Sequence, residues 1–245
     1  MRSYREDRDH SSPSGPWWRV ERFEKVPSEL DWLSSEERRH LNRLRVEKRR
    51  RDWLLGRWTA KSALLRHPYL SSSSVEPCDL TVRPAADGAP EALLRNRRLP
   101  VSLSLSHRAG WGLCALAPED MLAGCDLEVV EARSSGFLSD YYSDEEQAIL
   151  RSEPDLHMDQ IATFFWAAKE STLKALRVGL RADTRRIQVS SSAEPGTFGR
   201  WTRLTVQDTE SDLSFGAWGR MLGALATVVV TSPPSREPSK LDGGL

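Results

Sequence analysis

Two acidic stretches decide how this chain is interpreted: Gly124-Cys125-Asp126-Leu127-Glu128, and Trp166-Ala167-Ala168-Lys169-Glu170-Ser171 with Lys174 close behind. Together they offer three carboxylates and two lysines. Carboxylate oxygens are ligands that Mg²⁺ prefers, and a lysine ammonium group can bind phosphate. The two stretches therefore predict a site that holds a divalent cation against a diphosphate, and they favour phosphoryl or pyrophosphate-ester chemistry.

The spacing within each stretch predicts how these residues are presented. Residues 122–130 are predicted to form a strand on which Asp126 and Glu128 share a face, while Leu127 points into the core. Residues 160–178 are predicted to form a helix, on which Glu170 and Lys174 lie four residues apart. Taken alone, each pair also fits a bland interpretation, a surface ion pair or acidic residues on an exposed strand face. The presence of both pairs in one chain favours a functional site.

The segments around these stretches predict an α+β fold in two similar lobes. Ser34 to Glu37 and Ser143 to Glu146 have the Ser-x-x-Glu pattern of a helix capping box, and the first opens one long or two successive helices ending near residue 66. Apolar or alternating segments predict strands at 80–82, 101–106, 112–116, 187–190, 203–206, 213–217 and 224–230. We assign the lobes to residues 17–118 and 119–231. We expect the polar ends, 1–16 and 232–245, to be disordered tails.

Composition limits the class of protein. The 245 residues carry no net charge, which gives no overall field for nucleic acid or membrane binding. A basic segment between Arg38 and Lys61 is either a local anion site or a solvated helix face. The three cysteines lack metal-ligand spacing, the N-terminus is charged, and no apolar run approaches the ~20 residues of a membrane span. We expect a soluble, cytoplasmic protein.

The motifs resemble those of the 4'-phosphopantetheinyl transferase superfamily, in particular the larger pseudo-dimeric type that activates surfactin synthetase. The family pattern, a Gly-x-Asp-x-Glu strand followed by Trp-x-x-Lys-Glu-Ser/Ala-x-x-Lys, is met by 124–128 and 166–174. Agreement extends to Gly88-Ala89-Pro90, to Ser104-Leu105-Ser106-His107 and to the aromatic-Ser-x-x-Glu stretch 142–146. The resemblance covers roughly residues 30–230 and implies two related α+β lobes that form a pseudo-dimer.

The resemblance implies an enzyme, a holo-[acyl-carrier-protein] synthase. Such enzymes transfer the phosphopantetheine arm of coenzyme A to a serine of an acyl or peptidyl carrier protein and release adenosine 3',5'-bisphosphate. The carriers belong to fatty acid, polyketide or nonribosomal peptide synthesis. By resemblance, Asp126, Glu128 and Glu170 bind Mg²⁺, and Lys174 contacts the diphosphate. Glu128, Glu170 and Lys174 are thus the expected catalytic residues.

The serine needs a general base, and Glu128, or a water that it orients, is the first candidate. Glu146 is a second candidate, although the same position is the reciprocal glutamate of a capping box. For Glu146 we favour the structural role in the capping box over a catalytic one.

The coenzyme A contacts are also expected by resemblance. His107 and Ser106 would hold the 3'-phosphate with basic residues of the first lobe, for which Arg57 and Lys61, four apart on a predicted helix, are candidates. The loop with Gly88 and Pro90 would lie against the adenine, because these residues permit close and rigid backbone approach. Glu37 and His40 stand where some members of the family have lysines.

Two other functions remain as alternatives. A catalytically silent homologue would bind coenzyme A or a carrier protein, although it would have little reason to keep the metal site together with Lys174. A nucleic-acid binder would use the early arginines and would need aromatic residues that stack on bases, whereas Trp53 and Trp58 fall at core spacing. We expect a monomer that binds its carrier protein transiently and binds neither nucleic acid nor membranes.

Overall fold

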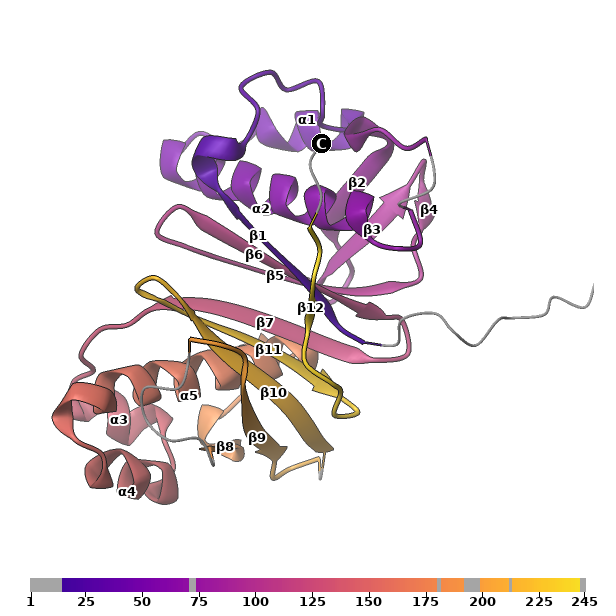
Figure 1. Cartoon of the computed structure of the whole chain (residues 1–245). Helices are drawn as coiled ribbons and strands as arrows, with labels where there is room; N and C mark the ends of the chain where they lie inside the picture. Colours follow the sequence, from indigo (N-terminus) through magenta and orange to yellow (C-terminus); the bar gives the residue numbers. More distant parts are fainter. Residues whose placement is uncertain (1–14, 71–73, 180–181, 192–198, 212, 243–245) are drawn as a thin grey trace, which may run out of the picture.

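The structure is a computed structural model of the chain, and it describes residues 15–70, 74–179, 182–191, 199–211 and 213–242. The described residues form four stacked layers in the order helix, sheet, sheet, helix (Figure 1). Helix α2 (Glu47–Arg66) covers a sheet with the strand order β12-β1-β6-β5, and helix α5 (Asp155–Ala175) covers a sheet with the order β7-β11-β10-β9-β8. The predicted α+β fold is confirmed.

Successive side chains of a strand point to opposite faces, and this explains how the two sheets supply apolar side chains to three layers, one under each helix and one between the sheets. In β1 (Trp17–Arg22), Trp17 belongs to the apolar cluster under α2, whereas its neighbour Trp18 belongs to the cluster between the two sheets. Leu127 of β7 also lies in this central cluster, as its sequence position predicted. Because successive side chains of a strand point to opposite faces, both faces of each sheet are covered.

We call the first sheet with its associated elements the first lobe, and the second sheet with its elements the second lobe. The remaining first-lobe elements are η1 (Phe23–Lys25), α1 (Ser35–Leu41), η2 (Pro77–Asp79), β2 (Leu80–Pro84), β3 (Pro90–Leu94), β4 (Arg97–Arg98), β5 (Val101–Arg108), β6 (Trp111–Pro118) and β12 (Ser239–Lys240). Those of the second lobe are β7 (Leu122–Val129), α3 (Ser135–Tyr141), α4 (Asp144–Ser152), η4 (Thr184–Arg186), β8 (Ile187–Ser191), β9 (Thr202–Asp208), β10 (Leu213–Leu222) and β11 (Leu225–Ser232).

A buried ion pair connects the first capping box to helix α2. The Ser34 hydroxyl accepts a hydrogen bond from the backbone N–H of Glu37, and the Glu37 carboxylate accepts one from the backbone N–H of Ser34. The other oxygen of Glu37 accepts from the N–H of Val82 on β2. Lys61 of α2 lies 2.5 Å from Glu37, and both side chains are buried. The pair thereby fastens α1, α2 and β2 together.

The second lobe repeats this arrangement. Ser143 and Glu146 form the capping box of α4, and Glu146 also accepts from the N–H of Val189 on β8. Lys169 of α5 lies 2.7 Å from Glu146, and again both side chains are buried. The two lobes therefore share a local construction, although their sequences show no obvious repeat.

The C-terminal segment is part of the first lobe, which corrects the expected disordered tail from 232 to 245. Strand β12 pairs in parallel with β1, and Leu241 is buried in the cluster under α2. The N–H of Leu241 donates to the Trp18 carbonyl at 2.9 Å. The open edge of β1 offers unpaired backbone groups, and short polar segments can satisfy them as a strand. Residues 1–14 and 243–245 lie outside the described residues.

Among the described helices, none has both the length and the apolar character that crossing a membrane requires.

Candidate active site

The three carboxylates singled out in the sequence meet between β7 and α5. One oxygen from each of Asp126, Glu128 and Glu170 lies within 4.8 Å of the others. The predicted common face for Asp126 and Glu128 is confirmed, since both strand residues approach the same glutamate of α5. The cluster is large enough to hold one divalent cation between oxygen ligands.

Gly124 allows α5 to approach β7 closely enough for this cluster to form. A Cβ atom at this position would lie 1.8 Å from the carbonyl oxygen of Ser171 and 3.0 Å from the backbone nitrogen of Ala175. Any other residue would therefore push the helix away from the strand. The close approach of α5 to β7 thus explains why the Gly-x-Asp-x-Glu stretch begins with a glycine.

Asp126 is held on one oxygen only. Its Oδ1 accepts hydrogen bonds from Lys174 Nζ at 2.6 Å and from Ser106 Oγ at 2.7 Å. Its Oδ2 is buried and has no hydrogen-bond partner among the described residues. A buried carboxylate oxygen without a partner is energetically costly. Its position in a group of three carboxylates fits a metal ligand.

Burial and mutual repulsion change the titration of the cluster. Burial, together with the negative charges of Asp126 and Glu128, raises the pKa of Glu170 to about 7. Burial and the charge of Asp126 also raise the pKa of Glu128, although Arg108, Arg133 and Lys174 oppose the shift. For Lys174, burial alone would lower the pKa, but the charge of Asp126 outweighs it and the pKa is raised. Lys174 therefore carries its charge, and Glu170 is about half protonated at neutral pH.

Two arginines beside the cluster were not foreseen from the sequence. Arg108 Nε lies 3.5 Å and Arg133 Nη2 lies 3.9 Å from the Glu128 carboxylate, and both arginines also approach Glu131. The guanidinium of Arg133 is stacked over the Phe137 ring. Both arginines lie outside the acidic motifs, Arg108 at the end of β5 and Arg133 after β7, and no local pattern predicted that they approach Glu128.

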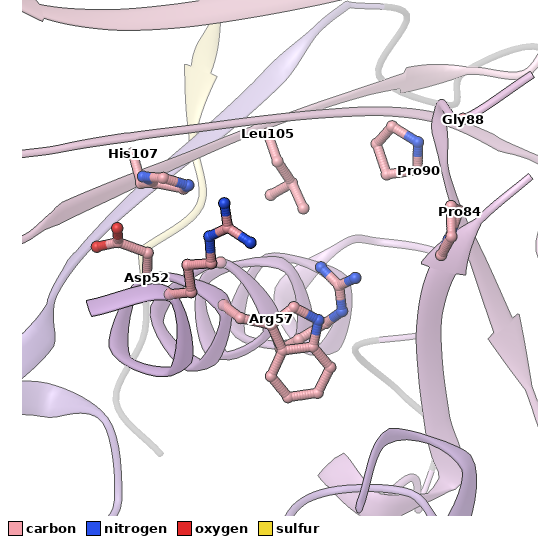
Figure 2. Close-up of a pocket in the computed structure, with 10 residues that line it drawn as sticks. Asp52, Arg57, Pro84, Gly88, Pro90, Leu105 and His107 are labelled. Carbon is pink, nitrogen blue, oxygen red and sulfur yellow. The ribbon is translucent and has the colours of Figure 1, made fainter. Parts of the chain in front are cut away.

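A cavity of about 400 Å³ lies in the first lobe between α2, β5 and the start of β3. Figure 2 shows Arg57, Leu105, Pro90 and His107 around this hollow. The size is that of a small-molecule site. Four residues expected to contact coenzyme A, namely Arg57, Gly88, Pro90 and His107, line it together.

Arg57 is one of two arginines that line this cavity, together with Arg49. Its guanidinium lies over the Trp53 ring, 4.8 Å from the centroid, and its Nε is buried without a hydrogen-bond partner among the described residues. Burial lowers the pKa of Arg57, while the charge of Glu37 acts in the opposite direction. An arginine with an unused donor fits an anion such as phosphate.

A second cavity, of about 250 Å³, adjoins the first and reaches Lys174. It shares Gly88, Pro90 and Leu105 with the first cavity, and Lys174 and Arg177 of the second lobe also line it. Asp87 and Arg177 form an ion pair at 2.9 Å across the two lobes. An extended ligand could thus run from Arg57 past the 88–90 loop to Lys174.

Two of the expected coenzyme A contacts are placed differently. Lys61 is fully buried and paired with Glu37, and its amine also donates to the Trp32 carbonyl, so it cannot reach a ligand in the cavity. The helical spacing of Arg57 and Lys61 suggested a shared face but could not show which face was internal. Ser106 donates to Asp126 and does not line the cavity with His107.

Glu146 and Lys169 also have structural partners. Glu146 is buried, completes its capping box and pairs with Lys169, whose amine donates to the carbonyl oxygens of Thr184 and Ile187. These contacts support the structural interpretation of Glu146. Lys174 is then the lysine of this motif that faces the carboxylate cluster.

Comparisons with known proteins agree with this site in part of the chain. Residues 123–223 match the model of the 4'-phosphopantetheinyl transferase superfamily. The crystal structure of the Thermotoga maritima holo-[acyl-carrier-protein] synthase is similar at 22% sequence identity and a TM-score of 0.36, covering 49% of this chain and 78% of that one. A TM-score of this size supports no conclusion. No curated protein matches the chain. The part of the chain that matches the 4'-phosphopantetheinyl transferase superfamily, residues 123–223, carries Asp126, Glu128, Glu170 and Lys174.

Proposed function

We propose that this protein transfers the 4'-phosphopantetheine arm of coenzyme A to a serine of an acyl or peptidyl carrier protein and releases adenosine 3',5'-bisphosphate. The match of residues 123–223 to the superfamily model supports the reaction class. The observation that carries the proposal is the cluster of Asp126, Glu128 and Glu170. Asp126 accepts from Lys174 on Oδ1, and its Oδ2 is buried without a hydrogen-bond partner among the described residues.

The carboxylates of this cluster would hold Mg²⁺, which, when bound, neutralises charge that develops on the diphosphate. Lys174 is charged and flexible, so its ammonium can donate to the departing phosphate. In the free protein it donates to Asp126 and to the Cys125 carbonyl. We propose Glu128 as the general base, acting directly or through a water that it orients, because its raised pKa favours proton acceptance.

The bond changes are those of a phosphoryl-type transfer. The serine hydroxyl loses its proton to Glu128 while its oxygen forms a bond to the phosphorus that carries pantetheine. The bond between that phosphorus and the bridging diphosphate oxygen breaks. Adenosine 3',5'-bisphosphate leaves with the negative charge that Lys174 stabilises.

The cavities support a matching placement of coenzyme A. We propose that the 3'-phosphate binds Arg57 and His107, that the adenine lies against the 88–90 loop, and that the diphosphate extends to Lys174. Arg57, His107 and the loop line one cavity, and the loop and Lys174 line the next. The pantetheine arm would then leave toward the carrier protein.

The intact mass of an apo carrier protein, measured after incubation with this protein, coenzyme A and Mg²⁺, tests the proposal. We expect a gain of one phosphopantetheine that is absent with Glu170→Ala and with EDTA. Circular dichroism establishes that the variant is folded. A folded wild-type protein that binds coenzyme A but modifies none of several acyl and peptidyl carriers would instead be the silent homologue.

A further inference from the structure

We propose that Ser106 is a positioning residue for the metal site, and that it sets the orientation of Asp126 from the other lobe. This inference deepens the proposed function, because it assumes that the carboxylate cluster holds the cation. It assigns to Ser106 a task other than contact with the 3'-phosphate, which its position beside His107 in the sequence had suggested.

Strand geometry places the side chains of Ser106 and His107 on opposite faces of the first sheet. Within the β5–β6 ladder, Ser106 is paired with Leu113, and His107 is paired with Gly112. Leu113 belongs to the apolar cluster between the two sheets. A Cβ at Gly112 would instead meet Thr59 and Leu55 of helix α2. Since directly paired residues share a face, Ser106 faces the second lobe and His107 faces α2.

The contacts between β5 and β7 involve the face of β5 that carries Ser106. On the face of Ser106, the Ser104 hydroxyl accepts a hydrogen bond from the backbone N–H of Cys125 at 3.0 Å. Two residues farther on, Ser106 Oγ donates to Asp126 Oδ1 at 2.7 Å. Arg108, the next residue on that face, lies 3.5 Å from Glu128. One face of β5 therefore lies along β7 and contacts it at Cys125, Asp126 and Glu128.

The hydrogen bond from Ser106 selects which Asp126 oxygen is available. Ser106 and Lys174 both donate to Oδ1, so the carboxylate plane is fixed by two donors that come from different lobes. Oδ2 of this carboxylate in the cluster is left buried, with no hydrogen-bond partner in the described part of the chain. Partners that orient a metal ligand in this way affect metal affinity without touching the ion.

The Ser106 hydroxyl is neutral, so its removal leaves the charge of the site unchanged. Loss of metal affinity in Ser106→Ala would then report orientation and not electrostatics. We expect Mn²⁺, used as a paramagnetic stand-in for Mg²⁺, to bind about 10-fold more weakly to this variant. Ser106→Thr keeps the hydroxyl and suits a strand, so it should recover most of the affinity.

Electron paramagnetic resonance of free Mn²⁺ measures this affinity in the full-length protein without carrier or coenzyme A. Ser102→Ala is the matched control, because Ser102 lies on the same face of β5, four residues before Ser106, and is paired with Ala117 away from the carboxylates. It should bind Mn²⁺ like the wild type. Thermal unfolding of each variant verifies that it is folded.

Calorimetric titration with coenzyme A in EDTA distinguishes the two roles of Ser106. Ser106→Ala should keep the coenzyme A affinity within about 2-fold, whereas a phosphate contact would lose about 10-fold. Weaker coenzyme A binding with unchanged Mn²⁺ binding would overturn the inference. So would equal Mn²⁺ affinity in Ser106→Ala and wild type, or a wild type that binds no Mn²⁺.

The proposed function can fail separately. If the wild type binds Mn²⁺ but modifies no carrier protein, the transferase proposal is lost, while weaker Mn²⁺ binding by Ser106→Ala still supports the positioning role.

Discussion

At the scale of single residues, the excess of negative charge between β7 and α5 governs the site. Three carboxylates share a space in which Lys174 supplies a close cation, 2.6 Å from Asp126, while Arg108 and Arg133 lie farther away, near Glu128. This excess of negative charge contributes to the raised pKa values of Glu128 and Glu170. A bound cation would relieve it, and the titration of Glu170 offers a way to measure the effect.

The first prediction concerns the proton that the cation displaces. With a pKa of about 7, Glu170 is mostly protonated at pH 6 and mostly ionised at pH 8 in the metal-free protein. A cation binds the ionised form, so its affinity should rise with pH up to about 7 and level off above it. Calorimetry in buffers of different ionisation enthalpy should detect more proton release at pH 6 than at pH 8.

Glu170→Gln is the control for this prediction, because it removes the titrating group at nearly constant volume. The remaining metal binding of that variant should release fewer protons at pH 6. Equal proton release at the two pH values in the wild type would contradict the assignment of the pKa to the metal site.

The second prediction concerns Arg57. If this guanidinium binds the 3'-phosphate, Arg57→Met should weaken coenzyme A binding by about 10-fold or more, since a hydrogen bond to a charged group contributes ~1.5–3 kcal/mol. Binding of dephospho-coenzyme A, which lacks that phosphate, should change little. Lys48→Met, which removes an exposed cation of the same helix beside a neighbouring cavity, should leave both affinities nearly unchanged. A similar loss for both ligands would place Arg57 elsewhere on coenzyme A.

At the scale of elements, the candidate site depends on how closely helix α5 lies against strand β7. The capping boxes predicted at Ser34 and Ser143 are present, and they begin α1 and α4. Residues 34–66 were predicted to form one long or two successive helices, and the structure has two. A strand is present at each position where the sequence predicted one. Elements without a strong local pattern, such as α3 and β3, were not predicted.

The third prediction tests the approach of α5 to β7. Gly124→Ala would place a methyl group 1.8 Å from the Ser171 carbonyl, so the helix must shift. We expect the free energy of unfolding to fall by about 3 kcal/mol, the upper end for overpacking, and we expect Mn²⁺ affinity to fall because Glu170 moves with the helix. Gly136→Ala, where only a contact at 4.0 Å arises, should change stability by less than about 0.5 kcal/mol. Urea unfolding gives both values, and equal effects would refute the steric argument.

At the scale of the whole molecule, the site is assembled from both lobes, and the chain end returns to the first. Ser106 reaches Asp126 across the central layer, and the Asp87–Arg177 ion pair also joins the lobes. The repeated Ser-x-x-Glu box with its buried lysine gives each lobe the same local construction. We propose that the lobes are related units and that the second cavity, which residues of both lobes line, depends on their relative position.

The fourth prediction concerns the C-terminal strand. A chain that ends at Glu237 loses β12 and the buried Leu241, whose side chain alone contributes roughly 2 kcal/mol. We expect the free energy of unfolding to fall by about 2 kcal/mol or more. A chain that ends at Asp242 keeps these contacts and should be as stable as the full chain. Equal stability of the two truncations in urea would show that β12 contributes nothing.

The sequence by itself determined the chemistry of the cluster, because strand and helix periods fix which nearby residues share a face. Spacing placed Asp126 with Glu128 and Glu170 with Lys174, the resemblance gave these residues their expected roles, and the Ser-x-x-Glu pattern identified both capping boxes. Only the tertiary structure decided which faces became internal. It buried Lys61 against Glu37, separated Ser106 from His107, added β12 to β1, and brought Arg133 to Glu128. The physical reason is that these contacts join segments far apart in the chain, and the packing of apolar layers selects them rather than any local pattern.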